Sequence, residues 1–464
     1  MVVLVDKVLT SDGSGENIER NREDIYIDLM VLKSSQVAEQ LTSSDRETLI
    51  TKKFEKYVSI QLNDIIQKGD KAVFIRGVGG TGKTTMLEML ALRWAKKEAI
   101  LHFDFVFMFT CREINTLLGE ISTVEELFRK KYPKVFDIIS LKDLESISDR
   151  VLIIVDGLDE LQDVYKLNNT NSNPLNLKFV LELIDTKNGV LKQHKIIACG
   201  RPKACELVKQ QFDDSNPKTI EVCGFSEENI KKYVKMFFGQ NEEKAKLVRE
   251  ALDIPSNLKV MATVPVFLWV ICCVYREELV KKQLNTYTEL YIYATLVFLR
   301  NHFRGNLQLK KMTFFELLEK EEIMQSVHAL MTLSVQTYME NKVLFTESDI
   351  GNLKCPTHLE KTGFIVKYNR GVNMRPVYQF KHLVMQEFFC GLCIHVTKLI
   401  SPHFKNDQLS GCAPIIFGTH RLLMENENEL FVSFFNKLSD ITRSRRWFFT
   451  EYFVMPFYHR SFNR

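Results

Sequence analysis

The chain has 464 residues, of which 45% are hydrophobic and 26% charged, so it has the length and the core material for several folded domains. Its 62 basic and 58 acidic residues leave a formal net charge of +4, which argues against a dedicated nucleic-acid-binding protein with a concentrated basic stripe. The ten cysteines are scattered and no secretory leader opens the sequence, which predicts reduced thiols in the cytoplasm. The longest apolar run, residues 260–275, contains Pro265 and falls short of a membrane span, so we expect a buried helix there.

The first part of the chain has weak signals for regular structure. Residues 1–43 are polar and carry Gly and Ser, so we expect a flexible or extended lead-in. Within it, residues 25–32 alternate weakly between apolar and polar positions, which is typical of a strand or of an extended segment docked on the next domain. Residues 44–66 have apolar side chains at helical spacing and predict a helix packed against a core.

Residues 77–85 match the phosphate-binding pattern G-x-x-x-x-G-K-[ST]. Glycines at this spacing let the backbone fold tightly and bring bare N–H groups against phosphate oxygens. Lys83 supplies a compact positive charge for the β- and γ-phosphates, and the Thr84 hydroxyl can ligate Mg²⁺. The expected phosphate-binding residues are Gly77, Gly79, Gly80, Thr81, Gly82, Lys83, Thr84 and Thr85. A buried strand before the loop and a helix after it fit this pattern, so the sequence predicts a site for ATP or ADP with Mg²⁺.

Strands and helices alternate from residue 71 to residue 224, which indicates a parallel sheet with crossover helices on both faces. The predicted strands are 72–76, 103–109, 151–155, 195–201 and 219–222, and the predicted helices are 86–97, 123–131, 141–147 and 179–184. The fold class that follows from this order, together with the phosphate loop, is an α/β P-loop NTPase.

Charged side chains are expected at the carboxyl ends of these strands, where ligands bind in open α/β sheets. Asp156 ends the apolar run 151–155 and is expected to be the Mg²⁺-side partner of the phosphate loop. Asp159 and Glu160 follow shortly after it, and a carboxylate there can orient or deprotonate an attacking water. Arg201 ends the next strand and can reach a γ-phosphate. The alternatives are an ordinary strand-to-helix turn at Asp156 and a surface arginine before a proline turn at Arg201.

Beyond Ser226 the strand signals nearly stop. Helical patterns cover residues 227–238, 242–252, 265–276, 286–303 and 314–338, and the last of these is long and amphipathic. Two short strands at 363–368 and 377–380 then predict a hairpin, which is followed by a helix at 385–399. Helices followed by such a hairpin indicate a winged-helix unit, and the rest of the chain reads as helical.

Together these motifs resemble the NACHT family of signal-transduction NTPases, and within it the NOD-like receptor type. The resemblance rests on the phosphate loop, Asp156-Gly-Leu-Asp-Glu160, Arg201, Gly224-Phe-Ser226 with the helix after it, Val264-Pro-Val-Phe-Leu268 and residues 380–389, all in the family's order. Gly200 stands where the family usually has Ser or Thr, and Phe389 and Cys390 stand where it usually has small residues. The resemblance divides the chain into a lead-in (1–43), a NACHT domain (44–224), a first helical domain (225–300), a winged-helix domain (301–383) and a second helical domain (384–464).

The resemblance implies a molecular switch, in which an ADP-bound closed form opens on nucleotide exchange and then oligomerises. It implies that Pro265 packs on the adenine and that His382 contacts the diphosphate from the winged helix, which would tie that domain to the nucleotide. From the residues alone, a proline at a helix start and a core histidine are the alternatives. The expected partners are the nucleotide, and further copies of the chain or a signalling adaptor in innate immunity. Hydrolysis is expected to be slow and to reset the switch.

Two other classes of function stay open from the sequence. A turnover P-loop ATPase or a kinase would use the same loop, although no substrate-binding insertion is evident. The second class is an interaction scaffold whose nucleotide site has lost its function, although Lys83, Thr84, Asp156 and Glu160 are all intact. Residues 1–50 are too short for a death-fold effector module and no leucine-rich repeat is evident after residue 400, so a fragment that lacks effector and repeat domains is a further alternative.

Overall fold

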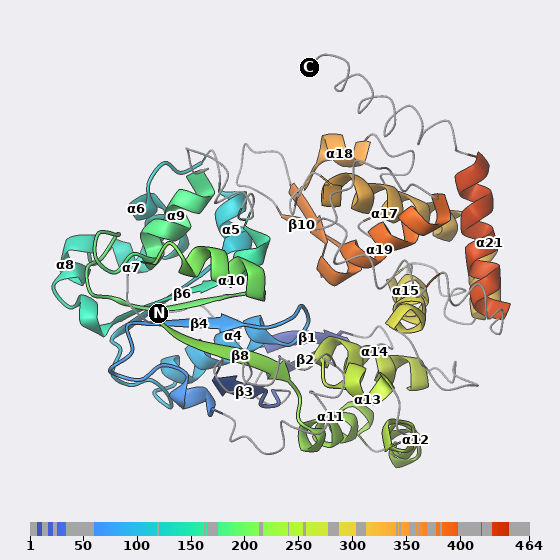
Figure 1. Cartoon of the computed structure of the whole chain (residues 1–464), viewed down its shortest axis with the longest axis horizontal. Coiled ribbons are helices and arrows are strands. Elements are labelled where there is room, and N and C mark those ends of the chain that lie inside the picture. Colours follow the sequence, from blue (N-terminus) through green and yellow to red (C-terminus); the bar gives the residue numbers. More distant parts are fainter. Residues whose placement is uncertain are drawn as a thin grey trace. The chain divides into compact units, whose positions relative to one another are not determined.

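The computed structural model divides into two compact units, Met1–Asn285 and Thr286–Arg464 (Figure 1). The structure describes residues 7–11, 17–21, 26–33, 60–117, 120–161, 164, 175–212, 217–239, 241–253, 257–276, 287–302, 312–339, 342, 345–351, 359, 362, 364–368, 377–380, 383–397, 419 and 429–444.

The predicted lead-in contains regular structure. Strands β1 (Lys7–Ser11) and β2 (Asn17–Asn21) form an antiparallel hairpin, so the expectation of a flexible segment is wrong there. A polar composition indicates a small core, but it does not exclude the backbone hydrogen bonds of a hairpin. Farther along, β3 (Met30–Lys33) pairs with a strand of the main sheet, which confirms the docked strand expected over residues 25–32.

A six-stranded sheet of order β3-β8-β4-β7-β6-β5 forms the centre of the first unit. Besides β3, its strands are β4 (Ala72–Arg76), β5 (Phe105–Thr110), β6 (Val151–Asp156), β7 (Lys195–Gly200) and β8 (Lys218–Gly224). All neighbours pair parallel except β3 with β8. Parallel strands are covered on both faces and need continuous apolar runs, and all six residues of β6 are buried. The predicted α/β fold is confirmed, and it brings the carboxyl ends of β4, β7 and β6 to one edge.

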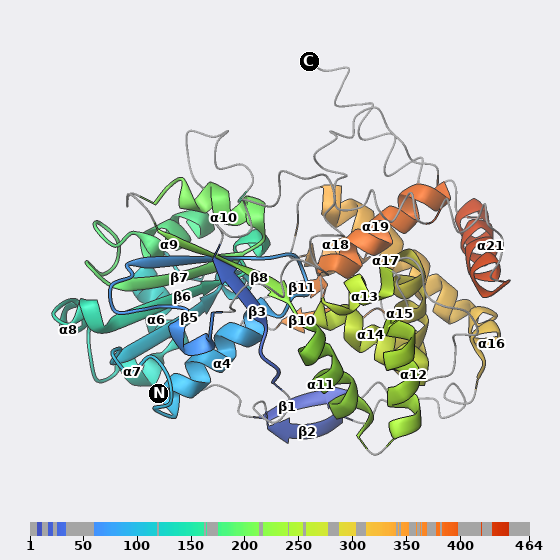
Figure 2. The ribbon, with the colours of Figure 1, turned by 60° about the horizontal axis from the view of Figure 1, so that its bottom comes forward.

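Helices cover both faces of this sheet (Figures 1 and 2). On one face, α4 (Lys83–Ala95) contacts β5 and β6. The other face is covered by α5 (Cys111–Thr116), α6 (Val124–Lys131), α7 (Pro133–Phe136), α8 (Leu141–Glu145), α9 (Leu175–Ile184) and α10 (Pro202–Lys209). The core on that face includes Phe74, Phe107 and Phe128, and the last two rings meet edge-on with centroids 5.1 Å apart.

The helix predicted over residues 44–66 is wrong in its described part. Residues 60–66 contain only the 3-10 turn η2 (Leu62–Asp64), and Gln61 before the turn is extended. The Ile60 N–H donates to the Val31 carbonyl at 2.8 Å, so the backbone here runs beside β3. Leu62 and Ile65, two of the apolar residues that suggested a helix, are buried all the same, and η2 packs on α4.

Strand β5 lies at the edge of the sheet, where unpaired backbone groups invite association with other chains. Tyr132 covers part of this edge. Its hydroxyl accepts from the Met108 N–H and donates to the Met108 carbonyl, both at 2.7 Å. Burial raises the pKa of the Tyr132 hydroxyl well above its ordinary value, so the hydroxyl stays protonated and keeps both bonds.

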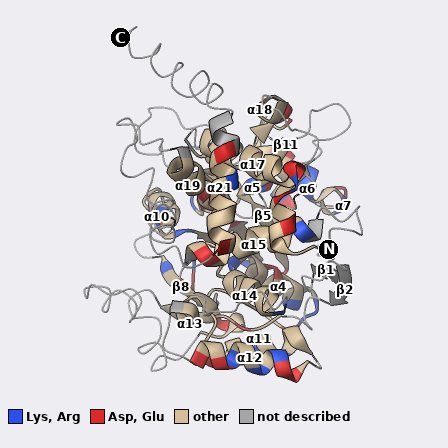
Figure 3. Cartoon of the chain, turned by 90° about the vertical axis from the view of Figure 1, so that its right-hand side faces the viewer, with Lys and Arg blue, Asp and Glu red and all other residues tan. Residues whose placement is uncertain are grey.

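Helices follow the sheet within the first unit: α11 (Glu227–Phe238), α12 (Glu242–Asp253), α13 (Asn257–Ala262) and α14 (Pro265–Arg276). The predicted cap of α11 is confirmed, because the Ser226 hydroxyl accepts from the Asn229 N–H at 3.2 Å. Acidic and basic residues are interspersed along α11 and α12 (Figure 3), and some, such as Glu228 and Lys232, form ion pairs one turn apart.

The second unit is mostly helical in its described part. Its helices are α15 (Tyr287–His302), α16 (Phe314–Leu318), α17 (Glu321–Met339), α18 (Glu347–Gly351), α19 (Leu383–Thr397) and α21 (Glu429–Ser444). Strands β9 (Phe345–Thr346), β10 (Ile365–Tyr368) and β11 (Val377–Phe380) form an antiparallel sheet of order β10-β11-β9. The hairpin expected in this region is therefore confirmed, and its assignment to a winged-helix domain stays a prediction. Within the described part of the chain, every helix is too short or too polar to span a lipid bilayer.

The single long helix predicted over residues 314–338 is wrong. It divides into α16 and α17, and the Lys320 N–H turns back to the Leu317 carbonyl at 3.1 Å. In one continuous helix, Leu318 and Ile323 would lie five residues and therefore about 140° apart around the axis. The break lets both side chains be buried.

Candidate functional site

The loop between β4 and α4 has the backbone shape that phosphate binding requires. Gly80 and Gly82 have φ angles of 81° and 90°, a conformation that other residues rarely adopt. A Cβ atom at Gly77 would lie 2.7 Å from the Val222 carbonyl oxygen, so only glycine fits there. Because α4 begins at Lys83, its free N–H groups and its dipole face the loop. The predicted residues lie in this loop and the first turn of α4: Gly77, Gly79, Gly80, Thr81, Gly82, Lys83, Thr84 and Thr85.

Two side chains brace the loop from inside. Lys83 Nζ donates to the carbonyl oxygens of Gly77 and Val78, each at 2.8 Å. Thr81 is 1% exposed, and its hydroxyl donates to the same Val78 carbonyl at 2.9 Å. The ammonium group therefore lies within the curve of the loop, where it can neutralise phosphate oxygens.

Asp156 ends β6, and only β7 separates that strand from β4. Its side chain is 4% exposed and is hydrogen-bonded to the Thr84 side chain. Burial raises the pKa of the Asp156 carboxyl, while the Thr84 hydrogen bond and the Lys83 charge act in the opposite direction. A hydroxyl and a carboxylate in contact beside a phosphate cradle fit Mg²⁺, which takes few protein ligands and fills its shell with water and phosphate. The described residues include no group of three or more His, Cys, Asp or Glu that could hold a metal ion.

Asp159 and Arg201, two predicted site residues, pair with each other. Asp159 belongs to the 3-10 turn η4 (Leu158–Glu160), and Arg201 caps α10 directly after β7. Arg201 Nε lies 3.1 Å from Asp159 Oδ2, and the Arg201 N–H donates to Asp159 Oδ1 at 2.9 Å. A Cβ at Gly200 would lie only 2.9 Å from Leu158 Cβ, so glycine lets η4 approach β7 this closely. The pair fixes the position of η4 at the edge of the sheet.

Glu160, the other predicted catalytic acid, pairs with Arg112. Arg112 Nε donates to Glu160 Oε2 at 3.0 Å, and Nη2 donates to Oε1 at 2.7 Å, so one guanidinium engages both carboxylate oxygens. Burial raises the pKa of the Glu160 carboxyl, and the charge and hydrogen bonds of Arg112 lower it. In this arrangement Glu160 is a poor base for an attacking water, because both of its oxygens already accept charged hydrogen bonds.

Helix α14 brings Pro265 to the loop. Pro265 is the first residue of the helix, and its two neighbours touch the loop. A Cβ at Gly80 would lie 2.4 Å from Val266 Cγ1 and 3.4 Å from Val264 Cγ1. The structure therefore brings the loop, Asp156, η4, Arg201 and Pro265 together, while His382 lies outside the described residues.

A family model of the NACHT domain matches residues 71–241, which span the parallel strands, their helices and α11. Several curated relatives are similar over more than two thirds of the chain. NACHT, LRR and PYD domains-containing protein 12 of Mus musculus is 27% identical over 334 residues, which cover 69% of this chain and 30% of that protein. The chain contains a NACHT domain and is similar to NACHT, LRR and PYD domains-containing proteins. Protein 3 of the same series, also from Mus musculus, is 23% identical over 76% of this chain and 33% of its own length. The protein 1 homolog of Danio rerio is 25% identical over 69% of this chain and 23% of its own length.

The NACHT-domain chain thus spans about a third of the length of the curated relatives it matches. Among solved structures, the Aeropyrum pernix ORC2 protein, described as ADPNP-ADP complexes, aligns with 76% of this chain and 89% of its own. Its identity is 10% and its TM-score 0.29, too low to carry an argument. The family match and the loop geometry agree, so this NACHT domain is a nucleotide-binding domain.

Helix α5 of the NACHT domain supplies two site residues that sequence reasoning missed. Besides Arg112, Asn115 reaches η4: its Nδ2 donates to the Glu160 carbonyl oxygen at 2.7 Å. Asn176 Nδ2 in turn donates to Asn115 Oδ1 at 3.1 Å, and both amides are 1% exposed. The available signal was the capping box of Thr110 and Glu113, directly after a predicted strand, which marks the start of α5.

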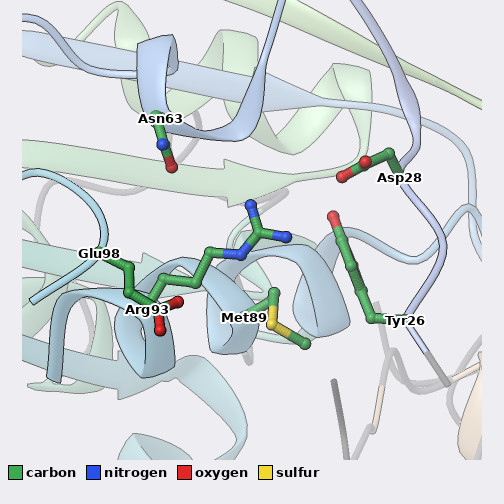
Figure 4. A pocket seen from close by; sticks show the side chains of 6 residues that line it. All are labelled: Tyr26, Asp28, Asn63, Met89, Arg93 and Glu98. Carbon is green, nitrogen blue, oxygen red and sulfur yellow. The ribbon is translucent and has the colours of Figure 1, made fainter. Parts of the chain in front are cut away.

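A separate pocket of about 390 Å³ lies beside α4 of the NACHT domain (Figure 4). Its lining residues are Tyr26, Asp28, Asn63, Met89, Arg93 and Glu98. The Arg93 guanidinium lies 6.0 Å from the centre of the Tyr26 ring. Arg93 is ten residues beyond Lys83, or about 15 Å of helix, and none of the predicted nucleotide ligands lines the pocket.

Proposed function

We propose that this chain is an ATP/ADP-dependent switch of the NOD-like receptor type, which acts in the cytoplasm in innate immune signalling. The observation that carries the proposal is the position of Lys83 in a glycine cradle beside the Thr84–Asp156 pair. The cradle binds the phosphates, and the Thr84–Asp156 pair holds Mg²⁺. Magnesium, when bound, neutralises charge that develops on the phosphates.

Hydrolysis in this proposal is slow and resets the switch. Glu160 acts as the base that orients or deprotonates water, and Asp159 supports it. In the described arrangement an arginine holds each of these carboxylates, so a productive base requires that Glu160 leave Arg112. Arg201 contacts the γ-phosphate, which has to compete with Asp159 for the guanidinium.

The adenine packs on Pro265, and His382 contacts the diphosphate from a winged-helix domain. ADP then favours a closed arrangement, and nucleotide exchange favours an open form that assembles with further copies or with a signalling adaptor. A switch of this kind requires only that the two nucleotides differ in their affinity for the two arrangements.

Replacing Lys83 with Ala tests the binding site. We expect ADP affinity to fall at least about a hundredfold, because charge-assisted phosphate contacts contribute about 1.5–3 kcal/mol each. Titration calorimetry with ADP and Mg²⁺ measures the loss. Lys192→Ala is the matched control. It also removes a lysine, but the Lys192 side chain is 67% exposed and its Nζ lies 3.8 Å from Glu145 Oε1, outside the phosphate loop. Unchanged affinity in the Lys83 variant would reject the site.

Replacing Glu160 with Gln tests the base. We expect ADP affinity to stay within about threefold and single-turnover hydrolysis of ATP to slow by about 10²-fold or more, as removal of a general base does. An unchanged rate of hydrolysis would show that Glu160 is not the general base. Steady-state turnover well above about one per second in the unaltered chain would favour a turnover ATPase or kinase instead.

A further inference from the structure

Residues 263–266, here called the 263–266 turn, comprise the link between α13 and α14 and the first two residues of α14, and they pack directly on the phosphate loop. Val266 fills the space that a side chain at Gly80 would need, since a Cβ there would meet Val266 Cγ1 at 2.4 Å. Val264 Cγ1 lies 3.4 Å from the same point, and its side chain is 8% exposed. Valine is stiff at χ1, so Val266 cannot swing away from the loop without moving the backbone of the turn.

The same turn is fixed to the end of β8. The Phe225 N–H donates to the Thr263 carbonyl at 2.6 Å. Gly224 has a φ angle of 95°, and a Cβ there would lie 2.1 Å from that carbonyl oxygen. The turn is therefore clamped between two glycines of the nucleotide-binding domain, one in the phosphate loop and one at the start of the connection to α11.

The contact with Gly80 depends on the conformation of the loop. Gly80 adopts its positive φ as part of the backbone shape that turns N–H groups toward phosphate. Phosphate that stabilises this shape also stabilises the surface on which Val266 packs. By linkage, the docked turn must favour phosphate binding by the same factor.

We propose that the 263–266 turn senses the phosphate loop directly through Val266 and Gly80, so that a polyphosphate without any base orders α14. This inference rests on the proposed nucleotide switch and names a regulatory route within it. The route is independent of the adenine, and it is also independent of the second unit, because all of its contacts lie within residues 77–276.

Hydrogen exchange of the full chain, followed by mass spectrometry, tests the proposal with two probes. Magnesium tripolyphosphate occupies the loop without a base, and Mg·ADP occupies it with one. In the unaltered chain we expect tripolyphosphate to slow exchange both in residues 77–86 and in α14, by about fivefold or more in the helix, the lower end of typical coupling between sites. This measurement uses the unaltered chain, so its result does not depend on whether a variant folds.

Val266→Ala is expected to abolish the response of α14 to tripolyphosphate while residues 77–86 stay protected. Val274→Ala is the matched control: Val274 is 0% exposed and lies eight residues, or about 12 Å, farther along the helix. It removes the same atoms from a buried site and should respond as the unaltered chain does.

Three outcomes overturn the inference. If tripolyphosphate protects residues 77–86 but only ADP protects α14, the coupling runs through the base. If Val266→Ala responds as fully as the unaltered chain, the valine contact is not the route. If neither probe protects residues 77–86, nucleotide binding itself fails and the inference falls with it, a result distinct from the other two.

Discussion

Replacing Arg112 with Ala would leave the Glu160 carboxylate without its main counter-charge. The two side chains are 26% and 20% exposed, so the pair is mostly removed from water. Breaking a fully buried pair by removing one partner costs about 3–5 kcal/mol, and partial exposure reduces this to about 2 kcal/mol here. With a urea dependence of about 2–3 kcal/mol per molar, the unfolding midpoint should fall by about 0.7–1 M. The fluorescence of Trp94, which lies in the same unit, can follow the transition.

The pH dependence of this loss distinguishes electrostatics from packing. Without Arg112, burial dominates at Glu160 and raises its pKa in the folded state above the unfolded value. The folded state then binds the proton more tightly, so stability lost at high pH is regained as the pH falls through the raised pKa. We expect the stability difference between Arg112→Ala and the unaltered chain to shrink from about pH 8 to about pH 5. Adding Glu160→Gln to Arg112→Ala should remove most of this difference. An equal deficit at both pH values, or no recovery in the double variant, refutes the reasoning.

A matched control removes an arginine from an exposed pair. Arg129 and Glu125 lie one turn apart on α6, and both side chains are 49% exposed. Exposed pairs contribute about 0–1 kcal/mol, so Arg129→Ala should lower the midpoint by less than about 0.5 M, with little dependence on pH.

Further predictions concern the framework of the site and use the same unfolding assay. Tyr132→Phe leaves the N–H and carbonyl of Met108 without their partner and should lower the free energy of unfolding by about 2 kcal/mol. An unchanged stability would mean that these two backbone groups of β5 form hydrogen bonds with another partner. Burial lowers the pKa of His194 in the folded state, so stability should fall as the pH drops below about 6.5; His194→Gln should flatten this dependence, and an unchanged slope would contradict it. Gly224→Ala should cost more than about 2 kcal/mol, because it combines a strained φ with a collision against the Thr263 carbonyl, and a neutral result would mean that the turn is not docked there.

Local signals in the sequence were sufficient for the fold class, and they also predicted which residues form the loop between β4 and α4, whose role as nucleotide ligands stays a prediction. The run from Val151 to Val155 is apolar throughout, which is typical of a strand buried on both faces, and Asp156 then marks its end. The glycines and Lys83 carry their chemistry within one short segment, so no long-range information was needed. Local spacing was misleading at residues 60–66, where Leu62, Ile65 and Ile66 are buried although the backbone forms only a single 3-10 turn after an extended residue.

The contacts that control the acids could not be predicted in the same way. Arg112 and Glu160 are 48 positions apart and meet only because β5 and β6 are neighbours in the sheet. Val266 reaches Gly80 from a different helix across nearly two hundred residues of sequence, and a glycine pattern does not reveal what fills the space beside it. Such pairings follow from the order of the strands and from the docking of α14, which single-sequence spacing does not encode.

The antiparallel pairing of β3 with β8 has a mechanical consequence. β3 reaches the sheet from the amino-terminal side, and β8 ends at Gly224, where the chain leaves for α11. Because Met30 pairs with Gly224, the start of β3 and the end of β8 lie at the same end of the ladder, so tension that separates them would break its hydrogen bonds one after another from that end. A pull on this strand would thus act first at the Met30–Gly224 pair, directly beside the connection to α11.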